Sequence, residues 1–320
     1  MSGTSRAFIF PGQGSQSVGM ARALADEFSV ARALLDEVDE ALGRKLSTLM
    51  FEGPQDELTL TANAQPALMA ASLATIRVLE AEAGLDLARD AAFVAGHSLG
   101  EYSALAAAGS LGVADAARLL RTRGEAMQAA VPVGEGAMAA LLGIDAEAAA
   151  TVAAQAAAEA GEGAVCEVAN DNGGGQVVVS GTAAAVARAI EIAKEAGARR
   201  SVLLPVSAPF HCRLMAPAAE KMKEALAGVD ILAPSVPLVA NVVAKSVSDP
   251  EEIRGLLVRQ ATGAVRWRES LVFMAEGGVS TFVECGAGKV LAGLVKRVCA
   301  AAGGISVGTP ADLPAYKALA

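Results

Sequence analysis

Residues 94–101 read VAGHSLGE, and this stretch decides the fold that the sequence predicts. The apolar residues 91–95 that lead into it form a run with the length of a buried strand. Residues 101–108, which follow it, contain strong helix formers and stop at a glycine. Strand, tight turn and helix in this order form the context that a nucleophile elbow requires.

The centre of the stretch is a Gly-x-Ser-x-Gly pattern around Ser98. The tight turn lifts the serine hydroxyl clear of the sheet, and a Cβ at Gly96 or Gly100 would meet the neighbouring strand or helix. The backbone N–H of Leu99 begins the helix and would point at an oxyanion formed on a substrate bound to Ser98. The alternative is a structural turn in which serine is merely small and polar.

The composition excludes several classes of partner. The chain has 320 residues, of which 53% are hydrophobic and 3% aromatic, so its apolar content is mostly alanine and small aliphatic residues. That content suits helices packed closely on a sheet, and the length allows two lobes. The formal net charge is −9, with no cluster of lysine and arginine to offset it, which disfavours binding to nucleic acid or to an anionic membrane.

The sequence also predicts a compartment. Residues 1–6 precede an apolar run, residues 7–10, that is too short for the hydrophobic core of a signal peptide. The longest uncharged run, residues 58–76, carries polar residues and a proline in its first half and does not favour a membrane span. The four cysteines form no Cys-x-x-Cys pair, so we expect a cytoplasmic protein with reduced thiols and no bound metal.

A second glycine-rich turn follows the first expected strand, residues 7–10. Residues 11–16 read PGQGSQ, and the two glycines around Gln13 let the backbone approach a ligand closely. The turn is not a dinucleotide fingerprint, because Ser17 stands at the third glycine position, and it lacks the Gly-Lys-Ser/Thr of a Walker loop. From these residues alone, a plain turn remains an equal interpretation.

The first and last parts of the chain alternate between helical and strand patterns. We expect helices over 21–42, 66–83, 113–129, 217–226, 251–260, 267–277 and 289–302, and strands over 236–242 and 281–284.

The middle of the chain has a different order of elements. Strands are expected over 137–143, 164–169, 176–180 and 201–204, with helices over 145–160 and 182–196. Strand, helix, strand, strand, helix, strand is the ferredoxin-like unit. The predicted fold is therefore α/β: an α/β-hydrolase-like catalytic subdomain with a parallel sheet, residues 1–135 and 206–320, into which a ferredoxin-like small subdomain, residues 136–205, is inserted.

A serine nucleophile needs a general base, and the chain has two histidines. His97 is adjacent to Ser98, and since neighbouring side chains point apart, it cannot easily reach the serine hydroxyl. His211 lies in a loop with two prolines and no helical periodicity, residues 205–212, where a catalytic residue is plausible. We predict that His211 is the base; the alternative is a histidine that only hydrogen-bonds within the fold.

Taken together, these motifs resemble the malonyl-CoA:acyl carrier protein transacylases, which load malonyl groups for fatty acid synthesis. The resemblance runs from residue 8 to about residue 297. Each segment is weak alone, but six in order at fitting separations are strong evidence. The segments are FPGQGSQ at 10–16, GHSLGEY at 96–102, RTRG at 121–124, PVS at 205–207 with HC at 211–212, VRQ at 258–260 with VRW at 265–267, and ECG at 284–286 with GK at 288–289.

The resemblance implies the catalytic roles. Ser98 is the nucleophile and His211 its base. Gln260 supplies the acceptor that orients His211, where a hydrolase would use an acid. The backbone N–H groups of Leu99 and Gln13 form the oxyanion hole.

The resemblance also implies how the substrate is held. Arg123 grips the free carboxylate of malonate, which a guanidinium can bind bidentately, and the other two arginines of its helix are interpreted as a solvated face. Asn172 and Gln176 match positions that contact the CoA arm, and His97 supports the site. Phe210 departs from the serine that many members carry before the histidine, and in related polyketide acyltransferases phenylalanine there accompanies selection of malonyl over methylmalonyl groups.

The implied reaction is a ping-pong transfer from malonyl-CoA to the phosphopantetheine thiol of acyl carrier protein. It needs no metal and no bound cofactor, and we expect a monomer. One alternative is a serine esterase or thioesterase, which should have an acid between Ser98 and His211, where Asp145 and Asp171 are the candidates. The other is a catalytically silent docking module, which an intact set of Ser98, His211 and Arg123 disfavours.

Overall fold

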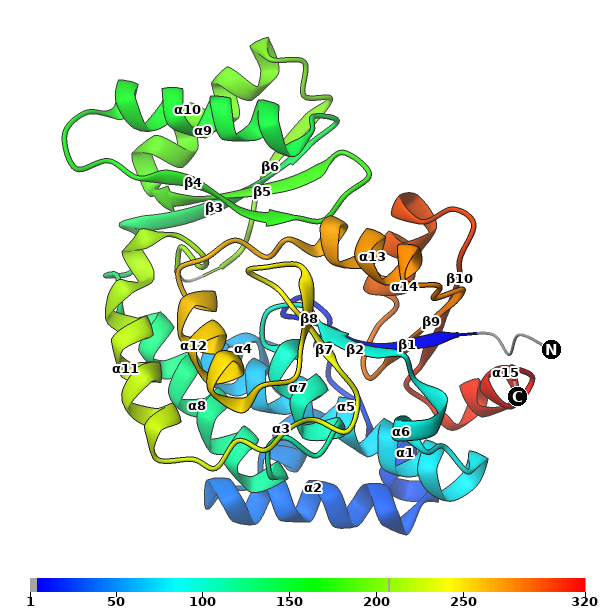
Figure 1. The fold of residues 1–320 in the computed structure, drawn as a ribbon. Helices are drawn as coiled ribbons and strands as arrows, with labels where there is room; N and C mark the ends of the chain where they lie inside the picture. The colour runs from blue at the N-terminus through cyan, green and yellow to red at the C-terminus, as the bar shows by residue number, and fades with distance from the viewer. Residues whose placement is uncertain (1–4, 207, 320) are drawn as a thin grey trace.

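A computed structural model describes residues 5–206 and 208–319. Two sequence expectations fall partly outside these residues: the N-terminal segment 1–6, expected not to lead into a signal peptide, includes residues 1–4, and the motif at 205–207 includes Ser207. Within the described residues the chain forms two sheets flanked by helices, a mixed α/β architecture (Figure 1).

The larger sheet has six strands in the order β10-β9-β1-β2-β7-β8. From β10 to β7 all neighbours are parallel, while β8 pairs antiparallel with β7 at the edge. The expected parallel sheet therefore carries one antiparallel edge strand. The strands are β1 Arg6–Phe10, β2 Phe93–Gly96, β7 Leu238–Ala240, β8 Lys245–Val247, β9 Thr281–Cys285 and β10 Gly303–Val307.

Strand β1 illustrates why this sheet is buried on both faces. Phe8 and Phe10 belong to a buried core shared with residues of α2, α5, α7 and α8, while Ala7 and Ile9 belong to a second core shared with residues of α13 and α14. Figure 1 shows α13 and α14 on one side of β1 and α5 and α7 on the other. The alternation along β1 is the two-residue period of a strand, and a parallel sheet needs cover on both sides. The helices of the larger part are α1 Arg22–Glu27, α2 Ser29–Leu42, α3 Leu46–Glu52, α4 Gln55–Thr59, α5 Thr61–Ala83, α6 Leu87–Asp90, α7 Gly100–Ala107, α8 Val113–Ala129, α11 Ala216–Ala227, α12 Pro250–Gln260, α13 Trp267–Glu276, α14 Val290–Val298 and α15 Leu313–Lys317, with short 3-10 turns at Arg213–Met215 and Pro310–Asp312.

The smaller sheet has the order β4-β5-β3-β6, and every neighbouring pair is antiparallel. Helices α9 and α10 cover one face over a core of alanine, valine and isoleucine. On the other face, Met138 and Val178 share a buried cluster with Met127 of α8 and Phe210. This sheet therefore lies over the larger part, as Figure 1 shows for the backbone. Its elements are β3 Gly136–Leu142, α9 Ala146–Ala160, β4 Cys166–Asp171, β5 Gln176–Thr182, α10 Ala183–Glu195 and β6 Arg200–Leu203.

Two expected helices have different limits in the structure. The helix expected over 21–42 is interrupted at Phe28, which is extended with φ −120° and ψ 119°. The helix expected from residue 66 begins at Thr61, with Pro66 inside it. Proline cannot donate to the carbonyl of Ala62 four residues earlier, and Arg121 of α8 donates to that oxygen instead. A neighbouring helix therefore compensates for a residue that local propensity treats as a helix breaker.

Strands β8 and β10 were not expected, and β7 is shorter than the run 236–242. The three residues of β8 are too few for a periodic signal, and β10 begins with two glycines, which are depleted in strands. The expected helix over 289–302 also ends earlier, at Val298. Both unexpected strands form by pairing at the two edges of the sheet, β8 with β7 and β10 with β9, and their own residue patterns do not indicate it.

Candidate active site

Ser98 lies in the turn between β2 and α7 with a φ of 54°, in the left-handed region. For a residue other than glycine, this conformation costs about 1–3 kcal/mol and persists only where the surrounding structure holds it. A Cβ at Gly96 would lie 1.9 Å from the carbonyl of Gly100, and a Cβ at Gly100 would lie 2.3 Å from the oxygen of Phe10. The requirement for both glycines is confirmed, and the turn has the geometry of a nucleophile elbow.

Asn241, which the sequence reasoning missed, holds this turn in place. Its Oδ1 accepts the backbone N–H of Ser98 at 2.8 Å, and its Nδ2 donates to the carbonyl of Gly96 at 2.8 Å. The side chain is fully buried and follows the end of β7, the neighbour of β2. A polar residue directly after a buried strand was the available signal, but nothing local indicated its partner.

Ser98 and His211 are in contact. Ser98 Oγ lies 2.8 Å from His211 Nε2, while His211 Nδ1 lies 2.9 Å from the backbone oxygen of Gln260 and 3.1 Å from that of Gly263. Since carbonyl oxygens only accept, Nδ1 carries the proton and Nε2 presents its lone pair to the serine hydroxyl. This is the tautomer that a general base needs.

The surroundings of His211 keep it neutral. Burial, with the positive charge of Arg123, lowers the pKa of His211 to about 3. Neither acid proposed for a hydrolase contacts it: Asp145 accepts the N–H of Ala148 at the start of α9, and Asp171 pairs with Arg268 at 2.7 Å. The imidazole therefore relies on two carbonyl dipoles rather than on a carboxylate.

Gln260 lies at the site as expected, but its side chain has another task than the one predicted. The acceptor for His211 is the backbone oxygen of Gln260. The side-chain Oε1 accepts from Arg123 at 2.9 Å, and Nε2 donates to the carbonyl of Ser98 at 3.0 Å and to Glu101 Oε2 at 3.0 Å. Sequence reasoning could name the residue but not which of its groups faces the histidine.

Glu101 is a fully buried carboxylate beneath the nucleophile, and its part in the site was also missed. Its Oε2 accepts both from Gln260 and from the backbone N–H of Asn241, each at 3.0 Å. Burial raises the pKa of Glu101 to about 7 in spite of these two bonds and of the charge of Arg123.

Arg123 reaches the nucleophile from α8 and is 2% exposed. Its Nη2 donates to Ser98 Oγ at 3.1 Å and to Gln260, and its Nη1 donates to Gln65 Oε1 at 2.8 Å. The choice of Arg123 over its neighbours fits this placement. Arg118 is exposed and pairs with Asp115, whereas the half-buried Arg121, expected to be solvated, contacts Asn63, Ala62 and Glu125.

Gln13 and Leu99 bring two backbone N–H groups to the same cavity as Ser98. Within residues 5–206 and 208–319, neither N–H has a hydrogen-bond acceptor. The cavity has a volume of about 510 Å³ and lies between the two sheets. Its lining includes Gly12, Gln13, Gln65, His97, Ser98, Leu99, Arg123, Met127, Met138, Asn172, Gln176, Val178, Phe210, His211 and Leu291.

The remaining predicted residues also line this cavity. His97 Nε2 lies 2.8 Å from Asn172 Oδ1, a contact that joins the elbow to the turn between β4 and β5. Gln176 Oε1 accepts from Arg297 at 3.4 Å. Phe210 is 8% exposed and packs with Met127 and Met138.

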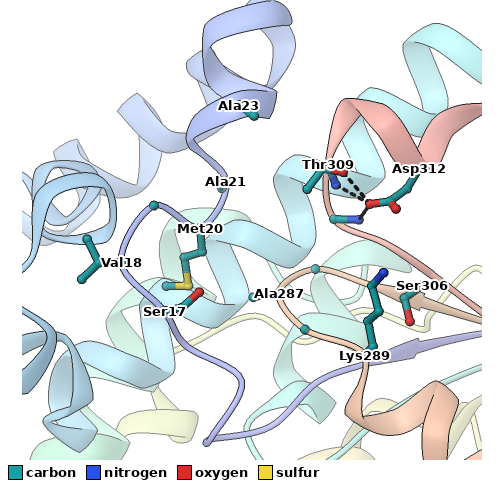
Figure 2. Close-up of a pocket in the computed structure, with 14 residues that line it drawn as sticks. Ser17, Val18, Met20, Ala21, Ala23, Ala287, Lys289, Ser306, Thr309 and Asp312 are labelled. Atoms are coloured by element: carbon teal, nitrogen blue, oxygen red, sulfur yellow. Dashed lines mark hydrogen bonds between the residues drawn. The ribbon is translucent and has the colours of Figure 1, made fainter.

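A second cavity of about 340 Å³ lies between the turn after β9 and residues 17–23. Figure 2 shows Ser17, Met20 and Ala287 on its walls, with Lys289 at its edge and Asp312 bonded to Thr309. Neither histidine lines it, and both line the first cavity.

The described part of the chain offers neither a cluster of metal-ligating side chains nor a membrane-spanning helix. No group of three or more histidine, cysteine or acidic side chains there could hold a metal ion. None of the helices there is long and apolar enough to cross a membrane.

Residues 7–309 match the sequence profile of the family described as the acyl transferase domain. A malonyl CoA-acyl carrier protein transacylase of Bacillus subtilis (strain 168) is 50% identical to this chain over 292 residues, which cover 91% of this chain and 90% of that protein. The protein of the same name from Salmonella typhimurium is 45% identical over 312 residues, 98% of each chain.

Solved structures agree with these sequence matches. An acyl-carrier-protein-S-malonyltransferase from Bartonella henselae superposes with a TM-score of 0.95 at 55% identity, covering 98% of this chain and 99% of that one. A type II PKS acyl-carrier protein in complex with its malonyl-transacylase matches with a TM-score of 0.91 at 42% identity, over 97% and 98% of the chains. Sequence and structure together establish that the chain belongs to the acyl transferase family and, within it, to the malonyl-CoA:acyl carrier protein transacylases.

Proposed function

We propose that the protein transfers a malonyl group from malonyl-CoA to the phosphopantetheine thiol of acyl carrier protein, in fatty acid biosynthesis, through a malonyl ester of Ser98. The observation that carries the proposal is that Ser98 Oγ lies within hydrogen-bond distance of both His211 Nε2 and Arg123 Nη2. Nucleophile, base and a buried cation thus share one cavity.

In the first half-reaction, Ser98 Oγ attacks the thioester carbon while His211 Nε2 takes its proton. The N–H groups of Leu99 and Gln13 hold the oxyanion, since they have no acceptor of their own among the described residues. Collapse of the intermediate breaks the carbon–sulfur bond, and His211 returns the proton to the departing CoA thiolate. A thioester is more reactive than an amide, which suits a base without a carboxylate behind it.

In the second half-reaction the carrier's thiol gives its proton to His211 and attacks the malonyl ester, and Ser98 leaves with that proton. Every group used is a side chain or backbone group of the protein, so the proposal includes no bound cofactor and no metal. All these groups come from one chain, which supports action as a monomer.

Arg123 is proposed to bind the malonyl carboxylate. Its Nε has no hydrogen-bond partner in the described residues, and its Nη2 contact to Ser98 can be exchanged for one to substrate. A buried guanidinium can form charge-assisted, bidentate hydrogen bonds with the malonyl carboxylate, which an acetyl group lacks. Phe210 is proposed to restrict branching at the malonyl α-carbon, because its ring lines the cavity beside the base.

The smaller sheet is proposed to hold the CoA arm. Asn172 lies on the turn between β4 and β5, and Gln176 begins β5; both line the cavity across from the elbow. The strand order supports treating residues 136–205 as a ferredoxin-like subdomain within an α/β-hydrolase-like subdomain of residues 1–135 and 206–320. The four free cysteines support a cytoplasmic location.

Mass spectrometry tests the proposal. Brief exposure to malonyl-CoA should add one malonyl group to the protein, on the peptide that contains Ser98. Subsequent addition of the phosphopantetheinylated carrier should remove the group and place it on the carrier thiol. Release of free malonate in place of transfer would indicate a hydrolase, and the absence of any adduct would indicate a silent docking module.

A further inference from the structure

Glu101 is a buried acid whose side chain bonds to Gln260, one of the two amides that hold Arg123. It lies in the first turn of α7, where a negative charge is favoured by the helix dipole. One oxygen, Oε2, accepts from both Asn241 and Gln260, while Oε1 is buried without a partner among the described residues. The arrangement links α7, β7 and α12 directly beneath the nucleophile.

Glu101 and the backbone oxygen of Ser98 together determine which way the amide of Gln260 points. Its Nε2 donates to both, and because Oε2 of Glu101 also accepts the N–H of Asn241, this oxygen acts as an acceptor whether the carboxyl group is charged or neutral. Oε1 of Gln260 then faces Arg123 and accepts from Nη2 at 2.9 Å. With the amide reversed, an NH₂ group would face the guanidinium, donor against donor. Gln65 holds Nη1 from the other side, so the two amides together define the plane of the guanidinium.

We propose that Glu101 is a positioning residue for substrate selection: through Gln260 it holds Arg123 in the orientation that receives the malonyl carboxylate. This inference rests on the proposed function, in which Arg123 binds that carboxylate. Glu101 itself does not face the cavity and touches no reacting atom. Its effect should therefore appear in the discrimination between malonyl and acetyl groups, not in the reactivity of Ser98 itself.

Two substitutions separate hydrogen bonding from charge. In Glu101→Gln, the amide oxygen can occupy the place of Oε2 and accept from Asn241 and Gln260, so malonyl-over-acetyl selectivity should stay within a few-fold of wild type. In Glu101→Leu, Gln260 loses one of the two acceptors that fix its direction, and only the carbonyl of Ser98 remains. We expect kcat/KM for malonyl-CoA to fall about tenfold, mainly through KM, the size of one hydrogen bond to a charged group, while acetyl transfer changes little.

The matched control is Glu284→Gln, which alters another buried carboxylate, one that accepts from backbone N–H groups at the start of α14. It should leave the malonyl-to-acetyl ratio unchanged. A double-mutant cycle then tests the route: in a Gln260→Met background, Glu101→Leu should change the ratio no further. If Glu101→Leu does not fold, Gln260→Met alone carries the test, because it breaks the same link and should lose the same selectivity.

The inference is overturned if Glu101→Leu or Gln260→Met lowers malonyl and acetyl transfer equally, or if Glu101→Gln is as impaired as Glu101→Leu. Arg123→Ala separates this from the proposed function. If Arg123→Ala lowers malonyl and acetyl transfer to the same extent, the assignment of the carboxylate site is wrong. If Arg123→Ala lowers mainly malonyl transfer while Glu101→Leu keeps the wild-type ratio, only the positioning role of Glu101 is wrong.

Discussion

Strands β2 and β9 lie on either side of β1, and each runs through a glycine-rich turn into a helix with a buried glutamate beside it. Glu284, near the end of β9, reaches the first turn of α14 and accepts the N–H groups of Leu291 at 3.1 Å and Ala292 at 2.8 Å. After β2, Glu101 turns away from its own helix and accepts from Asn241 and Gln260. The two turns therefore differ at the start of the helix that follows. At the turn after β9, called the closed turn, a carboxylate accepts from backbone N–H groups of the helix. At the turn after β2, called the open turn, Glu101 accepts from other segments instead.

The difference teaches that strand, glycine turn and helix do not by themselves make a site. At the open turn, the N–H of Leu99 has no acceptor among the described residues and adjoins the strained Ser98. At the closed turn, Ala287 takes the position between two glycines and the helix donors are occupied. Anion stabilisation at a helix start requires free donors, so only the turn after β2 is equipped for acyl chemistry.

The largest effect is expected from Ser98→Ala, which should abolish the malonyl-enzyme adduct, because the alanine has no oxygen to acylate. Adding Ala287→Ser to that variant supplies a serine at the closed turn, which has no base beside it and no free donors. It should restore neither the adduct nor transfer. Mass spectrometry after exposure to malonyl-CoA measures both. Labelling of any other residue in Ser98→Ala would contradict the comparison.

Arg123→Ala should give the next largest effect. Removing one partner of a buried charge pair costs about 3–5 kcal/mol, so kcat/KM for malonyl-CoA should fall roughly 10²–10³-fold. Acetyl-CoA carries no such charge and should lose far less, or even gain. The measurement is kcat/KM for both thioesters with wild type and variant. Equal losses would make Arg123 a structural residue of the open turn rather than the reader of the carboxylate.

The sequence identified the open turn because its signal is local. Gly96 and Gly100 are required by atoms within the turn and the adjoining strand, and Ser98 stands between them. Arg123 was chosen as the carboxylate-binding residue through the family resemblance, because nothing in the helical pattern distinguishes it from Arg118 and Arg121. The structure explains the choice through Gln65 and Gln260, which reach it from two other helices.

What the sequence missed depends on contacts between distant segments. Asn241 and Glu101 are separated by 140 positions and meet only because β7 lies beside β2. The carbonyls of Gln260 and Gly263 behind His211 were missed as well, because the type of a residue does not indicate what its backbone oxygen binds. Strand β8 was missed because three residues give no period, and the helix around Pro66 because Arg121 satisfies the carbonyl that proline leaves free.

His211→Ala should reduce acyl transfer by at least about 10²-fold, the usual contribution of a general base. The adduct on Ser98 should still form slowly, because the open turn keeps its free donors. Rates of acylation by malonyl-CoA, followed by rapid quench, separate this from a folding defect. Near-normal rates would place the base elsewhere, with His97 as the other candidate.

The smallest effect concerns stability, and it distinguishes the two glutamates directly. Burial raises the pKa of Glu101 to about 7 from an ordinary value of 4.5, so between these values the folded protein binds a proton that the unfolded chain does not. The stability that this proton contributes is present in full below pH 4.5 and is lost as pH rises toward 7. Burial also raises the pKa of Glu284, but two helix N–H groups and Ser306 favour its charged form.

Glu101→Gln removes this titration, so its free energy of unfolding should rise relative to wild type by up to about 1.4 kcal/mol per pH unit between pH 4.5 and 7. Glu284→Gln should show the same sign over a shorter interval that begins at the same pH, because its carboxylate has partners on both oxygens and Glu101 has them on one. Urea unfolding at half-unit steps from pH 4 to 8 measures both differences, with wild type as the reference at each pH. If the difference in unfolding free energy changes over the same pH interval for both variants, the charged form of Glu101 is stabilised as well as that of Glu284. If the difference for Glu101→Gln does not change with pH, the buried carboxylate does not titrate in this range. Either result would remove the electrostatic contrast between the open and the closed turn, leaving only the geometric one.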